Sequence, residues 1–275
     1  MANITVKPMD KLKAVLNVDS VKEQFKNALN ENSGAFLASI IDLYGSDTYL
    51  QKCDPQTVIM ECLKAATLKL PINKQLGFAY VVPYKSKGVY IPQFQLGYKG
   101  YIQLAMRTGQ YKFLNAGVLL EGVKIKQNIL TGEVEFTGEP TSTKAQGYFA
   151  YMQLTNGFTK TVYMTADEVL AHAKRYSKSF SYDSSAWKSN FDEMAIKTAM
   201  RKLLSHYGFL STEMATALTS DKDEDAESRA ANEIAQEANQ EVVDIDAEPA
   251  AGPEVPPAPE SQNDKVEHQS TGPDF

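Results

Sequence analysis

The sequence predicts an α+β fold: a curved antiparallel sheet packed against helices, with a helical N-terminal part and a disordered acidic C-terminal tail. Three observations support this prediction. Helix-start signals and helical periodicity dominate before residue 70, strand-like segments with short turns fill residues 78–164, and the charge changes sign near residue 220. Helices, then strands, then helices indicate α+β rather than an alternating α/β order.

Composition divides the 275-residue chain into two parts. Residues 1–220 carry 25 Lys and Arg against 18 Asp and Glu, whereas residues 221–275 carry 3 against 16. The second part lacks Leu, has Phe275 as its only aromatic residue and holds six of the twelve prolines. Such a segment cannot bury enough apolar surface to offset the entropy of ordering it. We therefore predict one folded domain over residues 1–220 and a disordered Pro-rich tail over 221–275.

Several classes of protein are excluded by what the sequence lacks. No run approaches the roughly 18 apolar residues of a membrane span, and the N-terminus has no apolar core of a signal peptide. Cys53 and Cys62 are too few for a disulfide framework and lack zinc spacing, so we expect buried thiols in a cytoplasmic protein. There is no P-loop motif, and the three histidines show no ligand spacing. The basic part has no acid cluster suited to a two-metal nuclease.

Helix signals are clear in the first third of the chain. Asp19-Ser20 and Ser33 can each cap a helix, and Asp54-Pro55 combines an N-cap with proline in the first turn. We expect the helix that begins there to end at Leu70-Pro71.

The middle of the chain favours strands. Phe78–Val82 reads as a strand that Pro83 bounds, residues 85–88 as a turn, and residues 89–96 as a second strand whose Pro92 indicates an edge or bulge. The remaining expected elements are a helix over 98–107, a strand over 111–120, a hairpin over 122–136, a hairpin of strands 144–154 and 158–164 around Asn156-Gly157, a capped helix from Thr165 to Arg175, a loop over 176–186 and a helix over about 190–207.

Residues 62–120 contain no Asp or Glu. Solvated surfaces normally mix both signs of charge, so this gap indicates a site for a polyanion. Nine aromatic residues lie among the cations; we expect more than half of their rings to fill the core. Cations that neutralise phosphates and rings that stack on bases are what single-stranded nucleic acid requires. The cations are Lys64, Lys69, Lys74, Lys85, Lys87, Lys99, Arg107 and Lys112.

The helix expected near residues 190–207 can be divided into faces at about 100° per residue. One face carries Ile196, Met200, Leu203 and Tyr207, which we expect to be buried. The opposite face carries Met194, Lys197, Thr198 and Arg201, which we expect to present two cations, one turn apart, to a phosphate backbone. An ordinary solvated face is the alternative.

Two further features allow two interpretations each. Gly97-Tyr98-Lys99-Gly100 can expose backbone N–H groups to an anion, or its glycines can permit close helix–sheet packing. Trp187, the only tryptophan, can anchor a Ser-rich loop in the core or stack on a base. Gln93, Gln95, Gln103 and Thr198 are candidate neutral neighbours of the bases.

Ordered motifs in the chain resemble the RecT family of phage single-strand annealing proteins. They are Gln75-Leu76-Gly77 with Ala79–Pro83, then Phe94–Gly100, then Arg107-Thr108-Gly109, and finally Trp187 with Met194–Ala199. The resemblance covers roughly residues 20–210. It implies an ATP-independent recombinase that coats single strands and anneals complementary ones, with no catalytic centre. The implied positions at the DNA are Lys99 and the Lys197–Arg201 face.

The resemblance also implies partners. These are single-stranded DNA and the annealed duplex intermediate, further copies of the chain in a ring or helical filament, and a phage-encoded 5′-to-3′ exonuclease; a host single-strand binding protein is a further candidate. The expected setting is the cytoplasm of a bacterial host of a phage or prophage. No cofactor is expected to be required, and Mg²⁺ accompanying the DNA is left open.

The sequence therefore predicts a DNA-binding set made of Gln93, Gln95, Tyr98, Lys99, Gln103, Arg107, Lys112, Trp187, Met194, Lys197, Thr198 and Arg201. The rival function is a passive protein that protects single strands without pairing them; a metal-dependent nuclease is a third reading.

Overall fold

A computed structural model describes residues 7–177, 179–183 and 185–221. All of them belong to one of the two units into which the chain divides, Met1–Glu233; the other, Ile234–Phe275, lies outside the described residues. The tail predicted over 221–275 therefore lies outside them too, apart from Asp221, and the predicted boundary stays a prediction.

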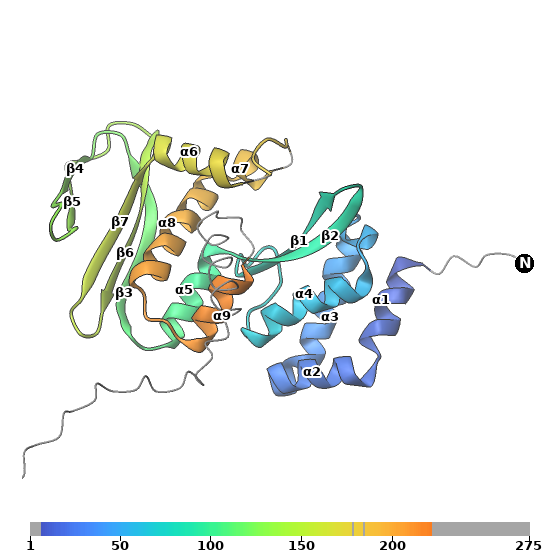
Figure 1. Ribbon diagram of the computed structural model, residues 1–275. Helices are drawn as coiled ribbons and strands as arrows, with labels where there is room; N and C mark the ends of the chain where they lie inside the picture. Colours follow the sequence, from blue (N-terminus) through green and yellow to red (C-terminus); the bar gives the residue numbers. More distant parts are fainter. Residues whose placement is uncertain (1–6, 178, 184, 222–275) are drawn as a thin grey trace, which may run out of the picture. The chain divides into compact units, whose positions relative to one another are not determined.

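The N-terminal part is helical, as predicted (Figure 1). Asp54 is the N-cap of the fourth helix and accepts a hydrogen bond from the Thr57 backbone N–H at 3.0 Å. That helix ends at Thr67, three residues before the predicted Leu70. The elements of this part are α1 Pro8–Leu16, α2 Asp19–Leu29, η1 Asn30–Asn32, α3 Ser33–Ser46, η2 Leu50–Lys52 and α4 Pro55–Thr67.

The predicted caps at Asp19-Ser20 and Ser33 are wrong in detail. Asp19 and Ser33 are the first residues of α2 and α3, and the preceding residues, Val18 and Asn32, make no side-chain cap hydrogen bond. The sequence thus located the starts of both helices, although neither start has the predicted side-chain cap.

Two strands, β1 Ala79–Ser86 and β2 Val89–Leu96, form a separate antiparallel hairpin. The prediction that Pro83 bounds the first strand is wrong, because the strand continues through it. Pro83 lies opposite Pro92, and a two-stranded sheet tolerates residues without an N–H at its outer edges. The turn is confined to Lys87 and Gly88, whose φ values of 48° and 85° suit a tight two-residue turn.

A second sheet has the order β3-β6-β7 and is antiparallel throughout. Helices α5, α8 and α6 lie against one face, while the β4–β5 hairpin lies on the other side (Figure 1), where the ring of Phe136 is 5.3 Å from that of Phe149. The elements are α5 Tyr98–Arg107, β3 Tyr111–Leu120, β4 Lys124–Gln127, β5 Val134–Thr137, β6 Ala145–Leu154, β7 Thr159–Thr165, α6 Ala166–Tyr176, α7 Ala186–Ser189, α8 Phe191–Tyr207 and α9 Thr212–Ser220.

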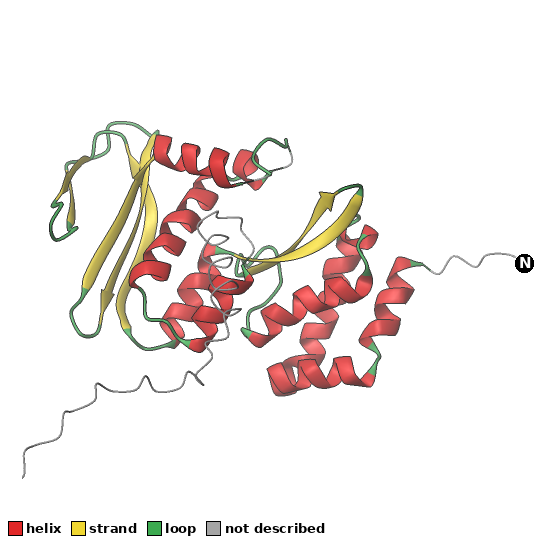
Figure 2. Ribbon diagram, viewed as in Figure 1, coloured by secondary structure: helices red, strands yellow, loops and turns green. Residues whose placement is uncertain are grey.

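The α+β class with antiparallel strands against helices is confirmed (Figure 2). The capping box of Thr165 and Glu168 and the turn at Asn156-Gly157 form as predicted. Helix α9 and the short α7 were not predicted. In the residues that the structure describes, the strands form three separate sheets rather than the one curved sheet predicted, and helix α5 lies between β2 and β3 in the sequence.

Both cysteines are buried and free, as expected. Burial raises the pKa of the Cys53 thiol to about 11, and the carboxylates of Asp47 and Asp54 add to the rise. Burial also raises the pKa of Cys62. Neither thiol is therefore activated as a thiolate.

Candidate nucleic-acid interface

A cavity of about 240 Å³ separates the β1–β2 hairpin from helices α6, α7 and α8. Its lining joins residues that are far apart in the sequence, and seven of the twelve residues predicted to bind DNA are among them. The lining residues are Tyr84, Lys85, Ser86, Ile91, Gln93, Gln95, His172, Ala173, Tyr176, Ser177, Ser179, Tyr182, Trp187, Met194, Lys197, Thr198 and Arg201. We call this cavity the groove.

The hairpin wall of the groove follows from strand alternation. Gln93 and Gln95 lie on one face of β2, whereas Phe94 and Leu96 are completely buried on the other. Gln95 Nε2 donates a hydrogen bond to the Tyr84 hydroxyl at 2.5 Å, across the two strands. The wall is therefore neutral and polar, held in place by the apolar face behind it.

Helix α8 forms the cationic floor. Lys197 and Arg201 are one helical turn apart and are only 6 % and 8 % exposed. Met194 and Thr198 border the groove beside them, and the Thr198 hydroxyl donates to the Met194 carbonyl at 2.9 Å. The two cations thus border the cavity without extending into bulk water.

A buried carboxylate lies beneath this floor. Asp221 Oδ2 is 3.4 Å from Lys197 Nζ and accepts a hydrogen bond from the Tyr101 hydroxyl at 2.7 Å. Asp221 Oδ1 accepts from the Leu96 backbone N–H at 3.3 Å, and its side chain has no exposed area. Asp221 therefore joins β2, α5 and α8 through a single side chain.

These contacts correct the predicted faces of α8. Met200 and Leu203 are buried as expected, but Ile196 is half-buried and Tyr207 is 42 % exposed. Lys197 and Arg201, predicted on an outward face, are buried. The reason is that α8 is covered on both sides, by strands β6 and β7 and by helix α5 with the Asp221 carboxylate. Their role in binding DNA stays a prediction.

Tyr80 links the hairpin to α8 electrostatically. Burial raises the pKa of its hydroxyl; the Glu193 carboxylate adds to the rise, and the Lys197 ammonium opposes it. Glu193 is exposed at the start of α8. An acidic side chain therefore flanks the cationic floor.

The five other predicted DNA residues do not line the groove. Tyr98 is half-buried, while Lys99, Gln103 and Lys112 are exposed. Lys112 Nζ is 5.8 Å from the centre of the Phe113 ring. The structure thus separates the predicted set into a groove group and an α5–β3 group.

Arg107 has a structural role that the sequence did not reveal. Its guanidinium donates to the backbone carbonyls of Leu68 at 2.7 Å and Lys69 at 2.9 Å. These carbonyls follow the end of α4, where helix carbonyls lack intrahelical partners. Arg107 therefore fastens α5 to the end of α4, and its assignment to DNA stays a prediction.

The glycines that open α5 favour the packing interpretation. A Cβ atom on Gly97 would lie 2.1 Å from the Gly77 carbonyl oxygen, and one on Gly100 would lie 2.3 Å from the Phe78 carbonyl oxygen. The Gly97 N–H donates to the Phe78 carbonyl at 2.9 Å. Both glycines are required for the close approach of α5 to the segment that enters β1.

Two of the eight cations between residues 62 and 120 pair with acids that precede this stretch in the sequence. Lys64 is 2.7 Å from Glu61, and Lys74 is 2.8 Å from Asp47. Five of the nine rings are buried in the core or pack against it, as expected for more than half: Phe78, Tyr90, Phe94, Tyr101 and Tyr111.

Trp187 anchors the loop before α8. It is 7 % exposed, and its ring is 5.6 Å from that of Phe191. One side of the residue borders the groove, so stacking on a base remains a prediction alongside the confirmed anchoring.

The residues at or beneath the groove that the sequence did not assign to DNA include Tyr84, His172, Tyr176 and Asp221. His172 and Tyr176 are four residues apart on α6, and their rings are 4.7 Å apart; that spacing was the available signal. No sequence signal distinguished Asp221 from the acidic residues that follow it in the tail.

Across residues 7–177, 179–183 and 185–221, no three His, Cys, Asp or Glu side chains gather as metal ligands. In the same residues, no helix is both long and apolar enough to cross a membrane.

Comparison with known proteins identifies the family. The RecT family model matches residues 34–237. The chain is 45 % identical to the uncharacterized protein YqaK of Bacillus subtilis (strain 168) over 240 residues, which cover 87 % of this chain and 80 % of that protein. It is 28 % identical to Protein RecT of Escherichia coli (strain K12) over 219 residues, covering 76 % and 79 %. The chain therefore belongs to the RecT family, whose members are single-strand annealing proteins of DNA recombination.

Proposed function

We propose that this protein holds one DNA strand in the groove and pairs it with a complementary strand without ATP. The observation that supports this most is that the groove brings together seven predicted DNA residues from segments about 100 residues apart. Its walls offer amides, rings and cations together, which suit the sugar-phosphate and the base faces.

Annealing requires the Watson–Crick edges to remain accessible. Neutral side chains such as Gln93, Gln95 and Thr198 can support bases without reading them. The second strand then selects itself by base pairing, so the protein needs no sequence readout. Neither ATP nor another cofactor is required in this proposal, and Mg²⁺ acts at most as a companion of the DNA.

We further propose that protomers assemble into a ring or helical filament. A filament would place one groove after another along the strand. A phage-encoded 5′-to-3′ exonuclease would supply the single strand, and a host single-strand binding protein is a further candidate partner.

The decisive measurement is strand pairing without nucleotide. Two complementary labelled oligonucleotides should pair markedly faster with the full-length protein than alone, in buffer without ATP. Binding without faster pairing would instead support a passive protector. Shortened strands after incubation with Mg²⁺ would support a nuclease.

A matched pair of substitutions locates the strand. Gln93→Glu adds a negative charge inside the groove, whereas Gln103→Glu adds the same charge on exposed α5. Repulsion of phosphates should weaken strand binding about tenfold for Gln93→Glu, with a smaller effect for Gln103→Glu. The opposite order would place the strand on α5.

The salt dependence of the affinity for single-stranded DNA should report how many grooves bind one strand. Three cations line each groove, Lys85, Lys197 and Arg201. With the slope for single strands, three phosphate contacts predict a loss of affinity of roughly 20-fold between 50 and 200 mM salt, whereas six to ten predict roughly 300-fold to 10⁴-fold. We expect the smaller loss for an oligonucleotide that spans one groove and the larger for one that spans several. An affinity independent of salt would contradict the proposal.

A further inference from the structure

Two tyrosine rings and two lysines form a cluster beside the groove. The rings of Tyr49 and Tyr90 are 5.5 Å apart. Lys52 Nζ lies 4.8 Å from the centre of the Tyr49 ring and 5.4 Å from that of Tyr90, and Lys85 Nζ lies 5.9 Å from the Tyr90 ring. We call Tyr49, Lys52, Lys85 and Tyr90 the tyrosine–lysine cluster.

The cluster lies mainly on the opposite face of the hairpin from the groove. Tyr90 is next to Ile91, which lines the groove, and neighbouring strand residues point to opposite faces. Tyr49 precedes the η2 turn and Lys52 ends it, and neither residue lines the groove. Lys85 lines the groove and also belongs to the cluster. The hairpin thus separates two cationic, aromatic surfaces.

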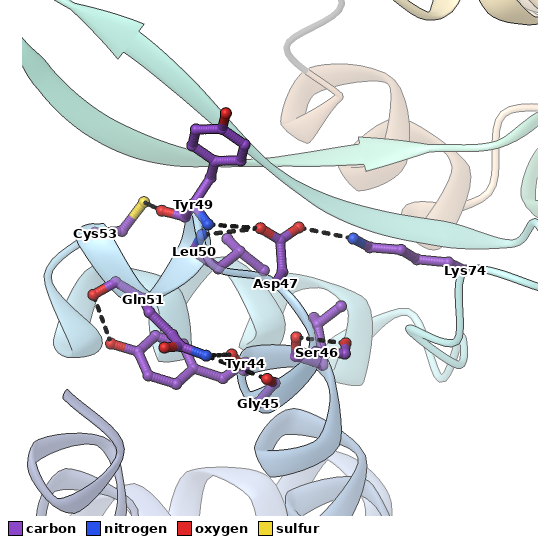
Figure 3. Close-up of polar contacts among 10 residues, drawn as sticks. Tyr44, Gly45, Ser46, Asp47, Tyr49, Leu50, Gln51, Cys53 and Lys74 are labelled. Atoms are coloured by element: carbon purple, nitrogen blue, oxygen red, sulfur yellow. Dashed lines mark hydrogen bonds and ion pairs between the residues drawn. The ribbon is translucent and has the colours of Figure 1, made fainter. Parts of the chain in front are cut away.

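The turn that carries Tyr49 is held rigidly. Asp47 Oδ1 accepts the backbone N–H groups of Tyr49 at 2.9 Å and Leu50 at 3.1 Å, while Asp47 Oδ2 accepts from Lys74 at 2.8 Å (Figure 3). The Cys53 thiol contacts the Tyr49 carbonyl at 3.6 Å. Figure 3 shows these contacts around the Asp47 carboxylate and the Tyr49 backbone, with the Tyr49 ring extending away from them. Tyr49 is 53 % exposed, so the residue is presented to solvent on a turn that these contacts support.

The charge around the cluster is positive. The hairpin from Ala79 to Leu96 has lysines and no acid. The carboxylates next to Tyr49 and Lys52 in the sequence have other partners: Asp47 pairs with Lys74, and Asp54 caps α4. Glu61, which contacts the hairpin, pairs with Lys64 and accepts the Phe94 backbone N–H. Lys52 and Lys85 form no ion pair with an acidic side chain in the described part of the chain. The surface is thus complementary to a polyanion.

We propose that the tyrosine–lysine cluster is a second site for single-stranded DNA, which captures the incoming strand; this rests on the annealing function proposed above. An exposed ring beside a cation stacks on any base while the cation attracts phosphate. Opposite faces of one hairpin keep the two strands close, so weak capture at the cluster raises the local concentration of the second strand at the groove.

The test uses Tyr49→Ala with Lys52→Ala in the full-length protein. The backbone contacts that support the turn remain available in this variant. The control is Lys160→Ala with Tyr207→Ala, which removes another cation–aromatic pair, at 4.9 Å, away from the groove. Thermal unfolding checks that both variants fold.

Second-strand binding is measured directly. Each protein is saturated with one labelled oligonucleotide, and a non-complementary oligonucleotide with a second label is titrated in; the first label reports that the first strand stays bound. We expect first-strand affinity within about twofold of wild type, and second-strand affinity and annealing rate about tenfold lower in the cluster variant only. Tyr49→Phe with Lys52→Arg should restore both.

Three results would overturn the proposal: unchanged second-strand binding in the cluster variant, an equal loss in the control, or an equal loss of first-strand affinity, which would make the cluster part of the first site. Because the second oligonucleotide is not complementary, this readout is independent of pairing. A wild-type protein that binds both strands but fails to anneal them would contradict the proposed function and leave the second site supported.

Discussion

Replacing Asp221 by Ala should lower the free energy of unfolding by about 3–5 kcal/mol, because it breaks a buried ion pair from one side. The Lys197 ammonium, 6 % exposed, would lose its carboxylate. The Tyr101 hydroxyl and the Leu96 N–H would lose their acceptor as well. Denaturant unfolding of the full-length protein measures the loss.

Asp42→Ala is the matched control, since Asp42 is an exposed acid on α3. Surface changes of this kind usually stay within about 0.5 kcal/mol. The partner substitution Lys197→Met and the double variant complete a thermodynamic cycle. If the two sites are coupled as the structure shows, the double variant should lose less than the sum of the single losses. An Asp221→Ala protein as stable as wild type would contradict the buried pair.

Because Asp221 contacts the folded domain, a truncation that tests the acidic tail must keep this residue. A chain ending at Ser220 loses the carboxylate along with the tail, so any loss of DNA binding could reflect a damaged groove floor. A chain ending at Lys222 keeps it. Only the difference between wild type and the second truncation reports on the tail itself.

Local signals predicted the elements well. Asp54-Pro55, Thr165 with Glu168 and Asn156-Gly157 each act within four residues, through a cap, a capping box and a tight turn. Such interactions depend only on neighbours in the chain, so the sequence contains all the information that they need.

The groove floor depended on distant contacts. Periodicity along α8 could not show that Lys197 is covered, because the cover comes from Asp221 and from α5. The hydrogen bond from Leu96 to Asp221 joins residues 125 apart. Arg107 shows the same limit: its partners belong to the end of α4, 38 and 39 residues earlier. The residue type gives the charge, whereas the partner of that charge depends on tertiary packing.

Gly100→Ala should strongly destabilise the protein, because the added methyl group has no room between α5 and the segment that enters β1. The new Cβ would be 2.3 Å from the Phe78 carbonyl oxygen and 2.7 Å from Leu96 Cδ1. A backbone oxygen cannot swing aside as a flexible side chain can, so α5 itself must move. That shift displaces Tyr101, the next residue, whose hydroxyl holds Asp221.

Overpacking typically costs about 1–3 kcal/mol and occasionally more, and we expect the upper end here or a failure to fold. Gly34→Ala is the matched control: it lies in α3, and its new Cβ would meet no atom within 4 Å. Alanine in a helix should stabilise there by up to about 1 kcal/mol. Glycine-to-alanine substitution should thus lower the free energy of unfolding at residue 100 and raise it at residue 34, as measured by denaturant unfolding. A Gly100→Ala protein as stable as wild type would show that α5 can withdraw from the β1 segment, and the floor of the groove would then not be fixed by these glycines.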